Sequence, residues 1–338
     1  MAAVVVERIW RTTTADEIES ELADVWRAVG QREQVAHAVM SNLVIFRDCE
    51  SIADLWTGAR ATDLPIDEVA ALHPSRVIIV SRAWAPGGSA TEIAAAVGVA
   101  IYGPPQTRYG VDRIAIRSSC ADASLPSIVR RLIRGDIPTS IWWADDLVSG
   151  LPEPLVTVGR QLVFDSRRWS NVKRCAAALA TALGNPRLDL ADLNWARLAP
   201  VRRAFVHAGD QLSAEELGYA NVRITYRPGE EALAWLLAAW LSTRIGWPVA
   251  TWPQIEPFPH PDDELITVEV GRSGEPTRMV LSTHQLVVKQ RGWPEYRTAI
   301  RVRSDAETMA EELKALSPDA GLRETLRALG RVSAATSP

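Results

Sequence analysis

The octapeptide TSIWWADD, residues 139–146, decides the class of fold that this chain adopts. Two tryptophans stand side by side in it, and two aspartates follow them directly. A stacking platform for a sugar would need both rings on one surface. Successive side chains of a β-strand point to opposite faces, so Trp142 and Trp143 cannot share one. The stretch therefore predicts a central strand of an α/β layer, with the aspartates at its end. If helices cover both faces of the sheet, the two rings fill different layers; if one face is open, one ring is an exposed anchor.

The segments around this stretch alternate between strand and helix patterns. Short apolar or alternating runs at residues 77–80, 113–117 and 162–165 predict strands. Residues 125–134 and 171–183 have the apolar spacing of helices. Such alternation is typical of parallel strands that are joined by helices.

Nearer the N-terminus, residues 14–30 predict a helix that Thr14 caps, with Glu17 at the capping-box spacing. Residues 42–46 fit either a strand or the end of a helix. Residues 92–103 contain alanines that favour a helix and β-branched residues that favour a strand. We assign them to a strand that pairs with residues 77–80.

The character of the chain changes after Pro186. Residues 189–207 predict a helix rich in Arg and Trp, and residues 230–245 predict a buried helix. Three β-like segments that follow a proline-rich connector predict an antiparallel meander, and residues 305–316 predict a final helix. The predicted fold class is thus α/β: a mixed, largely parallel sheet with flanking helices, plus a C-terminal α+β part with the meander. We place the domains at residues 1–186 and 187–330, with a boundary near 155 as the alternative.

Composition and charge narrow the function classes. The net charge is −4, from 37 basic and 41 acidic residues, which disfavours a nucleic-acid partner. The longest apolar run, residues 232–241, is half of what a membrane-spanning helix needs. The N-terminus has no basic region of a signal peptide, and three scattered cysteines, Cys49, Cys120 and Cys175, fit a reducing compartment. These features predict a cytoplasmic protein without a membrane partner.

Motifs for catalysis and cofactor binding are absent from the sequence. There is no glycine-rich phosphate loop, no HExxH metal motif and no GxSxG nucleophile motif. Residues 260–263 contain one histidine and two aspartates, but an exposed acidic turn explains them better than a metal site. Asp145 and Asp146 could act as an acid/base pair, but adjacent aspartates at a strand end more often cap the next helix. The missing motifs favour a binding protein over an enzyme and point to no cofactor and no metal.

Several segments in order resemble the OpcA family, the glucose-6-phosphate dehydrogenase assembly proteins. The resemblance spans roughly residues 35–300 and rests on five stretches of the chain: HPSRVIIV (73–80), RGDIPTSIWWADD (134–146), VFDSRRW (163–169), DLNWARLAPVR (192–202) and LLAAWLSTRIGW (236–247).

The resemblance implies a non-catalytic partner that binds glucose-6-phosphate dehydrogenase, helps its oligomers assemble and raises its activity. It acts at the entry of the oxidative pentose phosphate pathway, which supplies NADPH. Some photosynthetic members respond to redox state through cysteines in their C-terminal part. No cysteine follows Cys175 here, which argues against such control in this chain.

Tryptophan and arginine are enriched at contact surfaces between proteins, so they supply the candidate interface. The candidates are Trp142, Trp143, Trp169, Trp195, Arg197, Arg202 and Arg203. Core packing is the competing interpretation for the tryptophans, and a solvated helix face for the arginines. Two alternative functions stay open: a carbohydrate-active enzyme that uses Asp145 or Asp146, and a sugar-phosphate sensor that uses Arg167 and Arg168.

Overall fold

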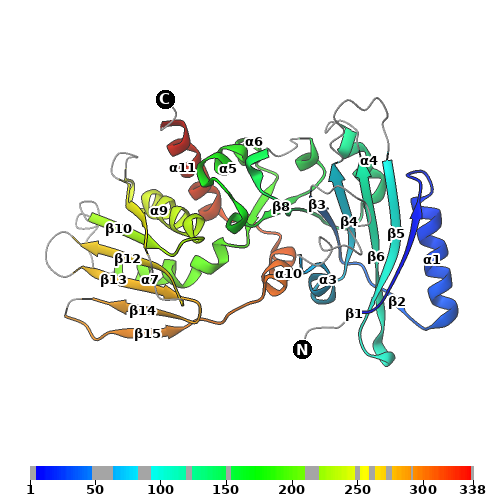
Figure 1. Cartoon of the computed structure of the whole chain (residues 1–338), viewed down its shortest axis with the longest axis horizontal. Helices are drawn as coiled ribbons and strands as arrows, with labels where there is room; N and C mark the ends of the chain where they lie inside the picture. Colours follow the sequence, from blue (N-terminus) through cyan, green and yellow to red (C-terminus); the bar gives the residue numbers. More distant parts are fainter. Residues whose placement is uncertain are drawn as a thin grey trace.

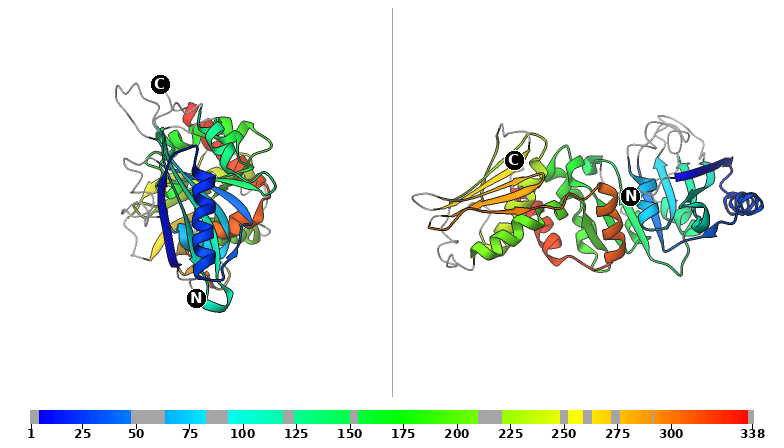
Figure 2. Two further views of the ribbon diagram at one scale, coloured as in Figure 1. Left: turned by 90° about the vertical axis from the view of Figure 1, so that its right-hand side faces the viewer. Right: turned by 90° about the horizontal axis from the view of Figure 1, so that it is seen from below.

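The computed structural model describes residues 5–47, 64–82, 93–118, 124–149, 154–209, 221–247, 252–258, 263–271, 276–290 and 292–335. Two β-sheets lie at opposite ends of an elongated molecule, with a layer of helices between them (Figures 1 and 2). The TSIWWADD stretch forms a strand near the middle of the larger sheet.

The larger sheet is mixed and largely parallel. Its strands run in the order β1-β5-β6-β4-β3-β7-β8-β9, and β2 adds to β6. The parallel pairs run from β6 to β9, whereas β5 is antiparallel to both β1 and β6. The bounds are β1 Val5–Thr13, β2 Ala36–His37, β3 Ser41–Phe46, β4 Ser75–Arg82, β5 Ile93–Tyr102, β6 Tyr109–Ser118, β7 Thr139–Trp143, β8 Gln161–Phe164 and β9 Asp189–Asp192.

Helices cover both faces of this sheet. The face that carries Trp143 packs against α1 (Ile18–Arg32), α4 (Leu125–Leu132), α5 (Val172–Ala178) and α6 (Ala180–Gly184). The face that carries Trp142 packs against α3 (Ile66–Leu72) and α10 (Asp305–Ala315). The two tryptophans thus lie in different layers of the core, as the alternation of a strand requires.

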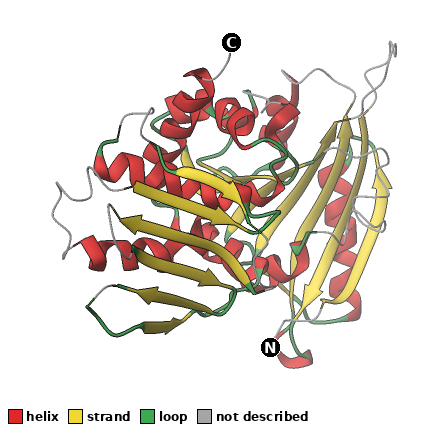
Figure 3. Cartoon of the chain, turned by 60° about the vertical axis from the view of Figure 1, so that its left-hand side comes forward, coloured by secondary structure: helices red, strands yellow, loops and turns green. Residues whose placement is uncertain are grey.

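The smaller sheet holds the antiparallel meander. Its order is β11-β10-β12-β13-β14-β15, and only the β10–β11 pair is parallel. The strands are β10 Asn221–Tyr226, β11 Gln254–Pro257, β12 Glu264–Gly271, β13 Thr277–Ser282, β14 Gln285–Lys289 and β15 Tyr296–Ala299. Helices α7 (Ala199–Gly209) and α9 (Glu231–Ile245) pack beside it, and Figure 3 shows this sheet and its helices facing the larger sheet. The predicted fold class is confirmed.

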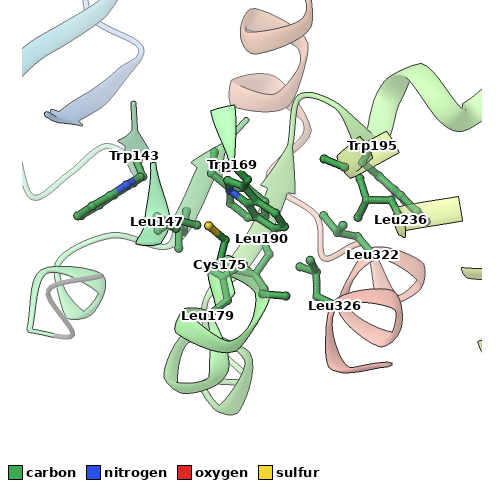
Figure 4. Close-up of a cluster of buried hydrophobic side chains, with 14 of the residues drawn as sticks. Trp143, Leu147, Trp169, Cys175, Leu179, Leu190, Trp195, Leu236, Leu322 and Leu326 are labelled. Atoms are coloured by element: carbon green, nitrogen blue, oxygen red, sulfur yellow. The ribbon is translucent and has the colours of Figure 1, made fainter. Parts of the chain in front are cut away.

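One hydrophobic cluster connects the two sheets. It continues from Trp143 through Trp169 and Cys175 to Leu236 of α9 (Figure 4). Helix α11 (Ala320–Ala335) closes the layer by packing against both α5 and α9, with Leu322 and Leu326 in the cluster. Because the apolar core is shared, both sheets bury apolar surface against the same layer of helices.

Several predicted elements change in the structure. Residues 42–46 form a strand, and residues 93–102 also form one, but it pairs with β1 and β6 and not with residues 77–80. The helix predicted at 189–207 is wrong at its start, because residues 189–192 pair with β8 as β9. The free edge of a parallel sheet stabilised a strand there over the helical preference. Strand β9 follows Pro186 in the chain and belongs to the larger sheet. The division into domains at residues 1–186 and 187–330 stays a prediction.

Elements near the chain ends also differ from expectation. The first helix begins at Ile18, and the Thr14 hydroxyl bonds the Glu17 carboxylate at 3.1 Å in place of a backbone N–H. Residues 305–316 are not the final helix, since α11 follows. Strands β11 and β15 were not predicted. The helix of 171–183 divides at Leu179 into α5 and α6.

Gly98 permits the close contact between β5 and β1. A Cβ at this position would lie 2.2 Å from the carbonyl oxygen of Ile9 and 2.9 Å from the ring of Trp10, which is the cross-strand partner of Gly98. We expect Gly98→Ala to destabilise the fold by about 1–3 kcal/mol, the usual cost of overpacking. Urea unfolding measures this, and Gly30→Ala is the control because a Cβ at Gly30 meets open space. Equal stabilities of the two variants would contradict the prediction.

Candidate functional site

Two neighbouring parallel strands, β8 and β9, end at the same edge of the larger sheet. Asp165 and Arg167 follow β8, and Asn194 and Arg197 follow β9. In α/β proteins, ligand sites form where parallel strands end, because loops from adjacent strands meet there. Here two of the stretches that carry the family resemblance, residues 163–169 and 192–202, converge in space.

The buried carboxylate of Asp192 connects these two loops. One carboxylate oxygen accepts hydrogen bonds from the backbone N–H groups of Ser166 and Asn194, both at 3.0 Å. The Asn194 amide donates to the Ser166 hydroxyl at 3.0 Å. Burial raises the pKa of Asp192 to about 7, so near neutral pH this carboxyl carries a proton in part of the molecules.

Carboxylates hold two arginines of these loops, Arg167 and Arg197, in fixed orientations. Arg167 bonds Asp165 and reaches Asp305 at the start of α10, where Nη2 donates at 2.8 Å. Arg197 donates to both carboxylate oxygens of Glu230, at 2.8 and 2.9 Å. Such two-pronged pairs restrict the guanidinium plane. The Nη1 group of Arg167 has no hydrogen-bond partner among the described residues and remains available as a donor.

Both arginines line a pocket of about 530 Å³ between α7, the meander and the segment before α10. Its floor is apolar, with Leu193, Leu281, Leu286 and Ile300. Five arginines line it, against Asp305 as the one acidic residue among its described lining. The arginines are Arg167, Arg197, Arg203, Arg301 and Arg303.

The pocket is lined by residues of β13, β14 and β15 on one side and of α7 on the other. Thr298 and Tyr296 of β15 lie opposite Leu286 and Val288 of β14, yet all four β15 residues are exposed. The side of α7 toward them carries small residues, Ala199 and Ala204, which leave the volume unfilled. Hydroxyl groups of Thr283 and Thr298 add hydrogen-bonding capacity.

The four candidate tryptophans lie in the interior. Trp142 and Trp143 are 3% and 1% exposed, and Trp143 stacks on Phe46 with a centroid distance of 4.5 Å. Trp169 is buried against Phe164. Trp195 is buried as well, and its indole N–H donates to Asp319 at 2.7 Å. Side chains buried this far contribute to stability and reach a partner only through their neighbours.

The candidate arginines divide by position. Arg197 and Arg203 line the pocket, and Arg203 is exposed without an ion pair among the described residues. Arg202 turns away and lies over the ring of Trp195, 3.6 Å from its centroid. Of the alternative pair, Arg167 lines the pocket, whereas Arg168 is exposed outside it.

Asp146 serves the loop after β7. Its oxygens accept from the N–H of Val148 at 3.1 Å, the N–H of Ser170 at 3.0 Å and the thiol of Cys175 at 3.0 Å. Burial opposes ionisation, but the hydrogen bonds from Cys175 and Ser170 outweigh it and lower the pKa of Asp146. A carboxylate held ionised in this way is a poor general acid. The same contact, together with burial, raises the pKa of the Cys175 thiol to about 12.

The described part of the chain contains no group of three or more potential metal ligands, and residues 260–262 of the acidic turn lie outside it. In the same ranges no helix combines the length and the apolar character that crossing a bilayer requires. Several pocket residues, notably Arg301, Arg303 and Tyr296, had no sequence signal. Asp165 did have one, since it ends the strand predicted at residues 162–165, whereas Asp192 and Asn194 fell in the helix predicted at 189–207.

Solved structures of known oxidoreductases are similar to this chain only at a low level. A 3-ketoreductase from Actinomadura kijaniata is 12% identical, with 87% of this chain and 96% of the other covered and a TM-score of 0.44. An oxidoreductase from Sinorhizobium meliloti is 10% identical, with 88% and 98% covered and a TM-score of 0.46. Similarity at this level supports no conclusion about activity.

The curated sequence relatives of this chain carry the same name. The OxPP cycle protein OpcA of Synechocystis sp. is 26% identical over 192 residues, which is 54% of this chain and 39% of the relative. The protein of the same name from Nostoc punctiforme is 28% identical over 193 residues, 54% of this chain and 40% of the relative. The matched region thus spans about two fifths of the length of these curated relatives.

Two domain families match in order along the chain, and both belong to the glucose-6-phosphate dehydrogenase subunit. The family of its N-terminal domain matches residues 66–181, and the family of its C-terminal domain matches residues 188–326. Together they cover most of the chain, including every residue of the two converging loops. The chain belongs to the OpcA family.

Proposed function

We propose that this chain is a non-catalytic partner of glucose-6-phosphate dehydrogenase that promotes assembly of the active enzyme in the oxidative pentose phosphate pathway. The observation that carries the proposal is the match of both domain families, in order, over residues 66–181 and 188–326. The mechanism is a shift in population. A partner that binds the active oligomer more tightly than the other forms raises the fraction of enzyme in that form.

The proposed contact surface is at the end of the molecule that holds the small sheet. Most of the large apolar side chains that are exposed in the described chain lie on or next to elements of that end: Val206, Phe258, Trp293, Tyr296 and Val302. Strand β15 is also an edge strand with exposed backbone groups, a feature that pairs readily with another chain. Exposed aromatic residues and arginines are the side chains that most often dominate binding between proteins.

The test measures complex formation and turnover with the dehydrogenase of the same cell. We expect the purified chain to retain the dehydrogenase in a pull-down and to increase its rate of NADP reduction. The proposal would be contradicted if the dehydrogenase were not retained and its rate did not change.

A matched pair of variants tests the contact surface. Trp293 is 60% exposed at the small sheet, and Met40 is 56% exposed at the large one. We expect Trp293→Ala to weaken the complex by about tenfold or more, as loss of an aromatic anchor does, and Met40→Ala to leave it unchanged. Equal affinities of the two variants would place the contact elsewhere on the molecule. Thermal melting of each variant checks that both remain folded.

A further inference from the structure

We propose that the arginine-lined pocket binds a phosphate-bearing small molecule. The chain carries a net charge of −4, yet five of its arginines converge on this one volume. Guanidinium groups bind phosphate oxygens through paired, charge-assisted hydrogen bonds. The inference does not depend on the proposed partner and concerns the isolated chain.

The pocket has the size and the lining of a small-molecule site. Pockets for small ligands usually measure about 300–1,000 Å³ and combine apolar walls with a few polar groups that fix orientation. This one measures about 530 Å³ and has a leucine-rich floor. An organic body would lie on Leu281 and Leu286, beside the ring of Tyr296, while the phosphate meets the arginines at the rim.

The arginines differ in how freely they can take up an anion. Arg197 is committed to Glu230, and Arg167 keeps only its Nη1 group free in the described structure. Arg203 has no ion pair there, and the Arg301 pair with Glu307 is long, at 3.4 Å, with Arg301 75% exposed. Arg203 is therefore the side chain that gains most from an arriving phosphate, and Arg301 is the second.

Arg203→Gln tests the assignment, because the variant removes the charge but keeps a hydrogen-bonding side chain of similar length. Its matched control is Arg297→Gln. Arg297 lies on β15 between the two pocket-lining residues Tyr296 and Thr298, so its side chain points to the opposite face. Ala199→Leu is a second variant, which narrows the cavity without changing charge.

Binding is measured by isothermal titration calorimetry on the full chain. The probes are NADP, ATP, glucose 6-phosphate and inorganic phosphate, with adenosine and glucose as phosphate-free counterparts. We expect at least one organic phosphate to bind the wild type, and Arg203→Gln to weaken it by about tenfold or more, the effect of losing one charge-assisted hydrogen bond. Ala199→Leu should abolish binding, and Arg297→Gln should leave it unchanged.

The probes also identify the source of the phosphate. Binding of NADP or ATP would mark a nucleotide site, and binding of glucose 6-phosphate would mark a sugar-phosphate site; both support the proposal. The proposal is overturned by the absence of binding at millimolar probe, by equal binding of the phosphate-free counterparts, or by unchanged binding in Arg203→Gln. Binding of inorganic phosphate with no gain from an organic body would overturn it as well. None of these outcomes bears on retention of the dehydrogenase in the pull-down.

Discussion

Asp112→Ala is expected to lower the free energy of unfolding by about 3–5 kcal/mol, the usual cost of breaking a buried ion pair from one side. Asp112 is fully buried on β6 and accepts hydrogen bonds from four neighbours. Arg76 Nη1 donates at 2.7 Å, Trp26 Nε1 at 2.7 Å, His37 Nε2 at 2.9 Å and Arg134 Nη2 at 3.5 Å. Arg76 is only 3% exposed, so the variant leaves a cation inside the protein with one carboxylate fewer.

Urea unfolding of the variant and the wild type measures this loss. The control is Asp24→Ala, which removes a carboxylate from an exposed pair with Arg27. That variant should cost less than about 1 kcal/mol, because exposed ion pairs contribute little. Similar losses in the two variants would show that the Asp112 cluster is not a stabilising centre.

The pH dependence of the unfolding free energy measures the contribution of Asp112 in a second way. Burial opposes ionisation of Asp112, but the hydrogen bond from His37 and the charge of Arg76 outweigh it and hold the pKa of this carboxyl below its usual range. A carboxyl with a lowered folded pKa contributes stability above its unfolded pKa, and the contribution disappears as pH falls through the folded value. The charged or titratable groups that face Asp112 are His37, Arg76 and Arg134. As the pH falls below about 5, we expect the free energy of unfolding to decrease less for Asp112→Ala than for the wild type.

Trp143→Ala is expected to destabilise the fold by about 3–5 kcal/mol, the range for large-to-small changes at buried aromatic positions. The side chain is 1% exposed and stacks on Phe46 within the cluster that joins the two sheets. Removing it would open a cavity between β7 and the helices that follow (Figure 4). Chemical denaturation gives the free energy, and thermal melting gives a matching fall in Tm.

Two further variants separate packing from hydrogen bonding. The indole Nε1 of Trp143 has no hydrogen-bond partner in the described part of the chain, so Trp143→Phe removes an unsatisfied donor and should cost less than Trp143→Ala. Trp293→Ala, at a residue 60% exposed, should change stability by less than about 0.5 kcal/mol. A loss below about 1 kcal/mol in Trp143→Ala would contradict the assignment of this residue to the core.

The burial of the candidate tryptophans shows where a sequence argument reaches its limit. A tryptophan in an interface and one in a core have the same chemical signature, an apolar ring with one donor. The alternation of residues 142 and 143 predicted that the rings point apart, which they do. Whether a face is covered depends on other segments. Here α10, about 160 residues further along the chain, covers Trp142: the carbonyl of Glu312 in α10 accepts a hydrogen bond from Gln161 of β8 at 2.9 Å.

The strand at 189–192 illustrates the same limit for local structure. Four residues carry too little periodicity to compete with the helical pattern that follows them. The backbone pairs with β8 because that edge of the sheet would otherwise leave its N–H and C=O groups without partners. This pairing also brings Asn194 and Arg197 beside Ser166 and Arg167, which creates one wall of the pocket.

The sequence by itself determined the α/β class, the central strand at 139–143, the buried helix at 231–245 and the meander, because periodicity and turn residues act over a few positions. Only the tertiary structure decided that Trp142 and Trp143 are covered, that β9 joins the sheet, and that five arginines from three separate segments face one apolar floor. Those outcomes depend on contacts between segments that are separated along the chain, which no local pattern encodes.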